Sequence, residues 1–562
     1  MNKFAQSGFS VLAIGLFVLS SSQILSSQSN LTQIANGNFR IAGTVVNAIS
    51  GQPLARARVS ITDTHADVRN RESIQSVLTS EDGRFDLRVQ AGKYALSAAR
   101  KGFITAFYDQ HGQFSSAIVT GTGLDTENLI LRIAPYAVLF GKVIDENGEP
   151  IRHAQVTVYR EDRLSGLSHI RPFRNALADD QGAYEIAPLD GGNYFISATA
   201  TPWYAVHVAS SQPGTDPSGK GVSSSNADRS LDVAYPTTYY ADVTESDEAT
   251  PIPVRGGDHI GVDIHLNPVP ALRLLFHPPG NLETGFTMPT FQKQAFDGLE
   301  NFQNSGAQMV SPGLFEITGI PAGKYKIHMP GVTDGQSEES ADVDLTNDGQ
   351  ELRISSGEPN GGVKATVRLL GSDSLPPQIN IALRNSKGKI SSVAAPDAKG
   401  EVDFPNITPG KYDVLAGSPT KAYSVAHMAL QGTKISGHTL SVPSGSSLSV
   451  LLSLTSGSVT VEGFATRSGK PAPGVMVILV PKDPESNREL FRRDQSDLDG
   501  SFSLRSVIPG FYTIIAIEDA WEMDWAKPAV IGHYCARGQI VKINGQANGF
   551  LRLPNPVDVQ SK

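Results

Sequence analysis

One short pattern occurs five times along this chain of 562 residues, and it constrains the fold more than any other feature. In each copy a turn glycine is followed by apolar residues two and four positions later, and then by a Gly-x-Tyr. The turn glycines are Gly83, Gly182, Gly313, Gly400 and Gly500, and the tyrosines are Tyr94, Tyr194, Tyr325, Tyr412 and Tyr512. Glycine and tyrosine are 12 residues apart in four copies and 11 apart in the first. The chain therefore repeats one structural unit.

The residues around each turn glycine predict two strands. Short polar residues or Pro ending in Gly favour a tight reversal with a positive φ. The alternation that follows, as at Phe85 and Leu87, is typical of a strand with one buried face. An apolar residue two positions after each tyrosine, such as Leu96, places the tyrosine on the same inward face. We expect each tyrosine hydroxyl to bond to a nearby carbonyl, as at the corner of an immunoglobulin-type sandwich, and to have a structural role.

The repeat spacing predicts whole domains. Successive turn glycines are 99, 131, 87 and 100 residues apart, which exceeds the period of about 20–50 residues found in solenoids and propellers. We predict an all-β fold of about five tandem seven-stranded Greek-key-type β-sandwich domains without substantial helices. The expected boundaries are 38–134, 135–268, 269–359 (degenerate), 360–456 and 457–556. Residues 210–228 are almost free of apolar side chains, so we interpret them as a disordered insertion in the second domain.

The first 22 residues have the pattern of a signal peptide. Lys3 supplies a positive charge, residues 9–19 are apolar, and small residues follow near position 22. The apolar stretch is shorter than the about 20 residues of a comfortable membrane span, although a retained N-terminal anchor stays open. The pattern predicts an exported protein, located in the periplasm, at the cell surface or outside the cell. The single cysteine, Cys535, fits a small buried hydrophobic residue or, alternatively, an intermolecular disulfide.

The spacing within each unit resembles the carboxypeptidase regulatory-like domain, a transthyretin-like sandwich that is also similar to Cna B-type and starch-binding-like folds. The first unit carries the resemblance in the series Gly43-x-Val45, Gly51-x-Pro53, Ala57-x-Val59, Asp82-Gly83-x-Phe85 and Gly92-x-Tyr94. The second unit repeats it as Gly141-x-Val143, Gly148-x-Pro150, Ala154-x-Val156, Gly182-x-Tyr184 and Gly192-x-Tyr194. The fifth unit is also clear, the fourth partial and the third weak. The resemblance implies exported multi-domain proteins without a defined activity.

The sequence offers no recognisable catalytic machinery. It has no His-Glu-x-x-His pair for zinc, no Gly-x-Ser-x-Gly nucleophile elbow and no phosphate-binding loop ending in Gly-Lys-Ser/Thr. The acidic turn at Asp497 and Asp499 lacks the acidic ligands that a calcium loop needs at positions 1 and 12, where Gln495 and Ser506 stand. The net charge of −9 without a basic cluster argues against nucleic acid as a partner. We therefore expect no enzyme activity, no catalytic residues, no metal and no cofactor.

The aromatic residues after the Gly-x-Tyr strands are the candidate binding residues. Trp203 and Trp521 each lie nine residues after a repeat tyrosine, with Tyr204 and Trp525 close by. Such residues cap a sandwich core or, if exposed, form a stacking platform for sugars or peptides. Four acidic residues close to Trp521 and Trp525 would add acceptors for hydroxyl groups: Glu518, Asp519, Glu522 and Asp524.

These observations favour a non-enzymatic exported binding protein. It would hold a carbohydrate or another cell-surface polymer through loops at the ends of the sandwiches. The alternative is a structural spacer or adhesion-type scaffold of the cell envelope that binds a protein partner. An enzyme with an unrecognised site is the third class. The preference for binding rests on the resemblance to starch-binding-like folds, which is an analogy of fold.

Overall fold

A computed structural model describes residues 39–562 apart from 65–74, 122, 208–213, 216–220, 223–228, 278–287, 303–305, 330–338, 353–359, 373, 386–389, 420, 431–432, 436, 458, 486 and 545–548. The predicted signal peptide and the question of a retained anchor lie outside the described residues. So does most of the predicted insertion at 210–228, within which only β14 (Gly214–Thr215) and β15 (Gly221–Val222) are described as a paired ladder.

The all-β prediction is confirmed, because the described residues form many separate β-sheets arranged as sandwiches. The first unit contains β1 (Phe39–Asn47), β2 (Arg58–Asp63), β3 (Gln75–Leu78), β4 (Arg84–Val89), β5 (Gly92–Ala99), β6 (Ala106–Phe107), β7 (Ile118–Thr120) and β8 (Leu129–Ile133). One sheet has the order β4-β1-β8, with β1 antiparallel to β4 and parallel to β8. The other has the order β3-β2-β5-β6, with β7 also paired to β5. Alternating side chains from both sheets meet in one apolar core.

The same pairing plan recurs in the later units. The second unit contains β9 (Ala137–Ile144), β10 (Gln155–Asp162), β11 (His169–Leu177), β12 (Ala183–Leu189), β13 (Gly192–Thr199), β17 (Thr238–Tyr239), β18 (Ile252–Val254), β19 (His259–Gly261) and β20 (Ile264–His265). The third contains β21 (Val269–Phe276), β22 (Thr290–Ala295), β23 (Gly298–Phe302), β24 (Gly306–Ser311), β25 (Leu314–Pro321), β26 (Gly323–Met329), β27 (Glu339–Leu345) and β28 (Gln350–Leu352). In both, the first strand pairs antiparallel with the strand after the turn glycine and parallel with a late strand.

The fourth and fifth units complete the series. The fourth contains β29 (Gly361–Leu369), β30 (Asn380–Asn385), β31 (Ile390–Ala394), β32 (Glu401–Ile407), β33 (Gly410–Gly417), β34 (Tyr423–Leu430), β35 (Thr433–Ile435), β36 (Thr439–Val442) and β37 (Ser447–Ser456). The fifth contains β38 (Val459–Arg467), β39 (Lys470–Pro471), β40 (Met476–Pro481), β41 (Arg492–Gln495), β42 (Ser501–Val507), β43 (Gly510–Ile517), β44 (Gln539–Ile543), β45 (Phe550–Arg552) and β46 (Val557–Gln560). It also carries the short helix α1 (Pro528–Cys535), which starts at a proline.

The repeated glycines and tyrosines have one geometry in all five units. Each turn glycine has a positive φ of 70–80°, a conformation that only glycine adopts at little cost. Each repeat tyrosine is buried and its hydroxyl donates to the backbone carbonyl four residues earlier. These bonds measure 2.7–3.1 Å, from Tyr512 to Ile508 at the short end and Tyr94 to Gln90 at the long end. The motif therefore fixes the corner between the two sheets.

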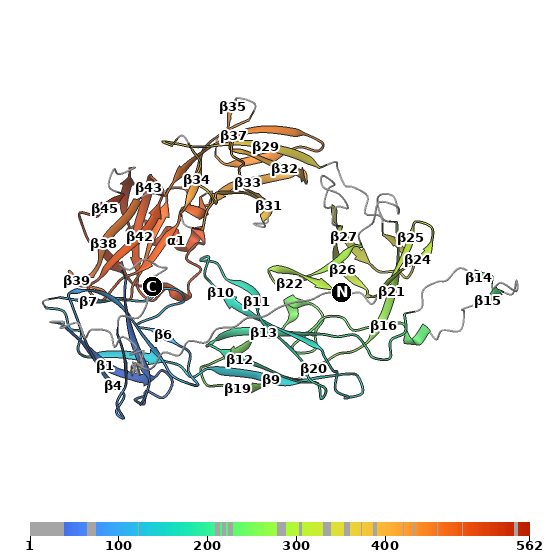
Figure 1. The fold of residues 1–562 in the computed structure, drawn as a ribbon, viewed down its shortest axis with the longest axis horizontal. Helices are drawn as coiled ribbons and strands as arrows, with labels where there is room; N and C mark the ends of the chain where they lie inside the picture. The colour runs from blue at the N-terminus through green and yellow to red at the C-terminus, as the bar shows by residue number, and fades with distance from the viewer. Residues whose placement is uncertain are drawn as a thin grey trace, which may run out of the picture.

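The five units follow one another around a closed path (Figure 1). The short strand β16 (Val233–Ala234) of the second unit pairs with β21 of the third, so these neighbours share a ladder. The first unit, at the start of the described chain, packs directly against the fifth, at its end. A row of sandwiches that could have extended as a stalk is closed upon itself.

Candidate functional site

The structure places the four candidate aromatic residues in two separate environments. Trp203 is 83% exposed at the end of the second unit. Its ring meets that of Tyr204 edge-on at a centroid distance of 5.7 Å. Trp525 is 5% exposed and Trp521 is half-buried, both between units. Of the four residues, only Trp203 is largely exposed to solvent.

The end of the second unit that carries Trp203, which we call the Trp203 end, also carries a small polar network. The hydroxyls of Tyr204 and Tyr235 both donate to the carboxylate of Glu146, at 2.5 and 3.2 Å. Burial is the main cause that raises the pKa of Tyr204 to about 12, and the bond to Glu146 adds to it. Both phenols therefore stay protonated at neutral pH and hold Glu146 beside the exposed indole. An aromatic face flanked by hydroxyls and a carboxylate suits a ligand with hydroxyl groups on an apolar ring.

Trp521 belongs to the contact between the fifth and first units. Its indole stacks on the imidazole of His111, with centroids 4.9 Å apart and planes 8° apart. Phe114 lies 5.9 Å away on the same side of the contact. The Trp521 Nε1 atom donates to the carbonyl of Gly474 within its own unit at 3.4 Å. Sequence spacing alone put Trp521 at a sandwich end, but could not show that another unit covers it.

Buried polar groups complete the contact between the first and fifth units. Ala117 N donates to the Asp497 carboxylate at 2.7 Å, and Leu498 N donates back to the Ala117 carbonyl at 3.1 Å. Lys93 Nζ forms an ion pair with the same carboxylate, with both side chains mostly buried. The Leu498 side chain packs against the core of the first unit. The acidic turn that resembled a calcium loop is thus a docking element between units.

Burial raises the pKa of the two aspartates in this region. The pKa of Asp497 is raised by burial, against the opposing effect of Lys93. The pKa of Asp494 is raised to about 6, first by burial and then by the charge of Asp497, although Ser503 N donates to it at 2.7 Å. Gln495 Nε2 donates to Ser116 Oγ across the contact at 2.9 Å. The contact is therefore polar, buried and hydrogen-bonded.

Trp525 belongs to a second contact, between the fifth and second units. Gly166, in a turn after β10, has a φ of +81°, and a Cβ there would lie 2.5 Å from the Trp525 ring. Ala526 N donates to the Gly166 carbonyl at 2.9 Å. Phe491 contacts the Trp525 ring at a centroid distance of 5.5 Å, and Arg493 lies over it at 5.0 Å. The indole fills the space that this glycine leaves open.

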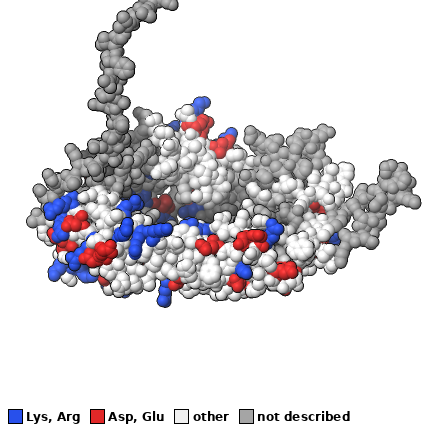
Figure 2. Space-filling model, turned by 60° about the horizontal axis from the view of Figure 1, so that its bottom comes forward, with Lys and Arg blue, Asp and Glu red and all other residues white. Residues whose placement is uncertain are grey.

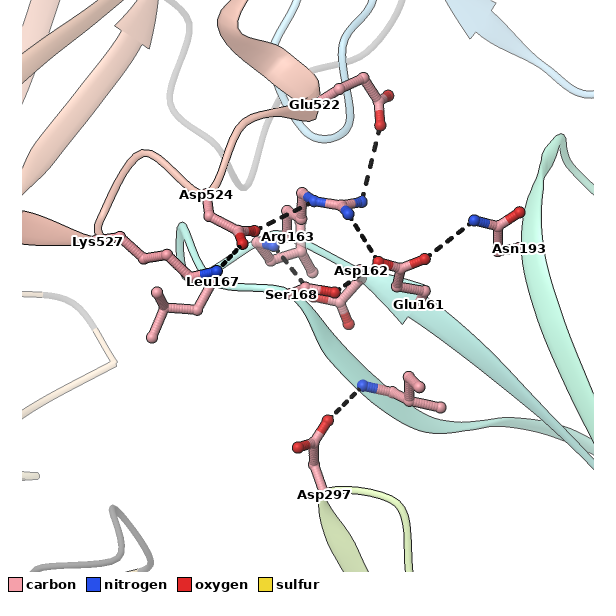
Figure 3. Close-up of polar contacts among 12 residues, drawn as sticks. Glu161, Asp162, Arg163, Leu167, Ser168, Asn193, Asp297, Glu522, Asp524 and Lys527 are labelled. Atoms are coloured by element: carbon pink, nitrogen blue, oxygen red, sulfur yellow. Dashed lines mark hydrogen bonds and ion pairs between the residues drawn. The ribbon is translucent and has the colours of Figure 1, made fainter. Parts of the chain in front are cut away.

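An ion-pair network surrounds this second contact (Figure 3). Arg163 of the second unit pairs with Glu161 at 2.7 Å and with Asp524 of the fifth unit at 3.3 Å. Lys527 pairs with the other oxygen of Asp524 at 2.5 Å. A hydrogen bond from Lys527, supported by the charge of Arg163, holds the pKa of Asp524 below its usual range. Asp524 is engaged in holding two units together.

The other acidic neighbours of these tryptophans are scattered. Glu518 pairs with Arg467 at 2.5 Å. Glu522 is largely exposed and lies 3.8 Å from Arg163. Asp519 has a left-handed backbone, with a φ of 49°, at the start of the short 3-10 helix Ala520–Glu522. They do not converge on a common point with Trp521 and Trp525.

Cys535 is half-buried at the end of α1 and packs against the cluster that contains Trp525. Burial raises the pKa of its thiol. Among the described residues, no group of three or more His, Cys, Asp or Glu side chains could hold a metal ion. Within the same part of the chain, no helix is long and apolar enough to span a membrane.

Comparison with known proteins identifies the first unit. Residues 40–117 match the model of the carboxypeptidase regulatory-like domain. No curated protein matches the chain. The TIE protein of Bacillus anthracis is similar at 12% identity, over 74% of this chain and 73% of that one, with a TM-score of 0.17.

Two pilins are also similar. A streptococcal ancillary pilin has 10% identity, over 56% of this chain and 98% of that one, with a TM-score of 0.20. The minor pilin GBS52 of Streptococcus agalactiae has 12% identity, over 41% of this chain and 97% of that one, also with a TM-score of 0.20. The chain is thus a series of β-sandwich units that includes, at residues 40–117, a carboxypeptidase regulatory-like domain.

Proposed function

We propose that this chain is a non-enzymatic exported binding protein that holds a carbohydrate or another cell-surface polymer at the Trp203 end of its second sandwich. The observation that carries the proposal is the 83% exposure of the Trp203 indole beside the Tyr204–Glu146–Tyr235 network. Flat aromatic rings bind sugars or peptides with little loss of side-chain entropy. Export is proposed from the pattern of residues 1–22.

Within this proposal the four aromatic residues divide into two roles. Trp203 and Tyr204 contact the polymer, whereas Trp521 and Trp525 hold the fifth unit against the first and second. Asp497 and Asp524, whose carboxylates bridge units, belong to the second role. The proposal keeps the five domain boundaries that the sequence predicts.

A scaffold that binds a protein partner is the second candidate function. It is favoured by the contact between the first and fifth units, because a closed arrangement presents neighbouring surfaces in a fixed geometry. The polar bonds around Gln495 and Ser116 make that contact specific. This candidate needs no exposed aromatic residue.

Depletion of the purified protein by insoluble polysaccharides and cell-envelope preparations tests the proposal. We expect specific depletion by at least one polymer and its loss in Trp203→Ala. Phe550→Ala is the matched control, because Phe550 is 61% exposed on the fifth unit. Retained depletion in Trp203→Ala would contradict the Trp203 site, and no depletion of the wild type by any polymer would leave the protein-partner scaffold as the better account.

A further inference from the structure

A cleft of about 760 Å³ lies over the outer face of one sheet of the second unit. Its floor is the sheet β11-β10-β13-β17, whose opposite face forms the core of that unit. Lys293, Glu300, Asn301 and Phe302 of the β22–β23 hairpin in the third unit line its other side. The volume falls in the range of about 300–1,000 Å³ that is usual for small-molecule sites.

The floor of this cleft is a regular array of neutral polar side chains. Strand register places Asn175, Thr157 and Ser197 side by side in one row, which continues to Tyr239. The next row joins Gln155 to Thr199. Strands lie about 4.8 Å apart, so polar groups repeat at that interval across the sheet.

Most of these side chains have no protein partner. The side chains of Gln155, Thr157, Asn175 and Thr199 make no hydrogen bond to another residue in the described part of the chain. Amides and hydroxyls can both donate and accept, as sugar hydroxyls do. The array can therefore exchange its bonds to water for bonds to a polyhydroxyl ligand.

Two charged groups that line the cleft, Lys293 and Glu300, are engaged by protein partners, which favours a neutral ligand. Lys293 is engaged by the Thr244 carbonyl at 2.8 Å and by Glu245 at 3.1 Å. Tyr159 donates to Glu300 at 2.6 Å, and burial raises the pKa of that carboxyl. Arg174 lies over the ring of Phe173, 5.5 Å from its centroid. Figure 2 shows blue and red side chains interspersed over the face of the molecule that lies at the bottom of Figure 1.

Two of the residues that line the cleft, Thr201 and Tyr235, connect it to the residues around Trp203. Thr201 lines the cleft, and Trp203 follows two residues later. Tyr235 also lines it, and its hydroxyl shares Glu146 with Tyr204. Phe173, 39% exposed, lies among the residues that line the cleft. Aromatic residues thus accompany the polar rows and continue to the Trp203 end.

We infer that this cleft binds a neutral oligosaccharide stretch of the polymer, with Gln155 and Asn175 as hydrogen-bonding residues and Trp203 at the outer end. The inference rests on the proposed function and adds its ligand class and its main site. Both amide side chains are exposed, so their loss leaves the core of the second unit intact.

Titration calorimetry on the full chain tests the inference, with cello-, xylo-, malto- and chito-oligosaccharides of two and six sugars, and a galacturonate hexamer as the acidic probe. We expect a neutral hexamer to bind and its dimer to bind more weakly. Gln155→Ala combined with Asn175→Ala should weaken hexamer binding about tenfold, the loss of two neutral hydrogen bonds. Gln308→Ala combined with Asn380→Ala, both exposed on other units, is the matched control.

Three outcomes would overturn the inference: no neutral hexamer binds, only the acidic hexamer binds, or the Gln155 and Asn175 variant binds as the wild type does. Depletion by insoluble polymer that depends on Trp203 would still support the proposed function in each case. Retained depletion together with normal hexamer binding in Trp203→Ala would support the cleft and reject the Trp203 end.

Discussion

At the scale of single residues, a glycine can decide whether another unit packs closely against a turn. Gly166 has a positive φ, and the Trp525 ring lies where its Cβ would be. Gly148, in the same unit, also has a positive φ, but a Cβ at that position would meet no atom within 4 Å. The two glycines share a backbone requirement and differ in their surroundings.

This pair gives a direct test of the Trp525 contact. Gly148→Ala should cost about 1–2 kcal/mol of stability from backbone strain alone. Gly166→Ala should cost about 1–3 kcal/mol more, because overpacking against Trp525 is added to the same strain. Thermal unfolding of both variants measures the difference. Equal losses would mean that Trp525 does not occupy the space beside Gly166.

Asp494 predicts a dependence of stability on pH. Its pKa is about 6 in the folded protein and near 3.9 when unfolded. Between these values the unfolded chain has released the proton that the folded chain keeps, so stability falls as pH rises from about 4 to about 6. A shift of this size corresponds to about 3 kcal/mol. Above pH 6 the loss is complete.

The Asp494→Asn variant checks this reasoning, because an amide has no proton to release in this range. The melting temperature of the variant, relative to the wild type, should be higher at pH 8 than at pH 4.5. Asp403→Asn, exposed on the fourth unit, serves as the control and should show no such change. A relative melting temperature for Asp494→Asn that is the same at both pH values would contradict the assignment.

At the scale of strands, the alternation of apolar and polar residues predicted most of the sandwiches. The strand β40 lacks this alternation because its outer face is covered by a second contact, which was not predicted from the sequence. In β2 buried and more exposed residues alternate, as expected for a sheet with one covered face. In β40 all six residues are buried. Val477 and Leu479 enter the sandwich core, whereas Met476, Ile478 and Val480 face a second cluster with Trp525 and α1. A continuous apolar run indicates a strand covered on both faces.

The apolar run could be seen in the sequence, but the residues that cover the outer face of this strand could not be identified from it. Apolar positions 476–480 and 514–517 indicate that something covers the outer face of this sheet. The covering residues come from Trp525 and α1 later in the same unit, and from Leu167 of the second unit. Contacts between units depend on loops such as the Gly166 turn, whose spacing follows no repeat. Sequence periodicity therefore predicts each sandwich better than the arrangement of the five.

The stacking of Trp521 on His111 gives a prediction for the contact between the first and fifth units. Trp521→Ala removes the stacked ring and should open this contact locally. The amides of Ala117 and Leu498, which bond across it, should then exchange their hydrogens faster. Trp203→Ala, which changes an exposed ring, should leave both rates unchanged. Unaltered exchange in Trp521→Ala would show that the ring does not hold the units together.

At the scale of the whole molecule, the closed arrangement of the five units determines which tryptophans are covered and which one can contact a ligand. Trp521 and Trp525 are covered because the fifth unit lies against the first and second, whereas Trp203 is outside both contacts. The buried ion pair between Lys93 and Asp497 adds to the specificity of the closed arrangement. An extended chain of the same sandwiches would return Trp521 to solvent and change which residues can meet a ligand.

Small-angle X-ray scattering of the purified wild-type chain, beside Lys93→Glu, tests this closure most directly. Lys93→Glu places a second negative charge against Asp497 and should disfavour the contact. We predict that the wild type scatters as the closed arrangement of Figure 1 and that Lys93→Glu has a larger radius of gyration. An extended profile for the wild type, unchanged in Lys93→Glu, would contradict the account.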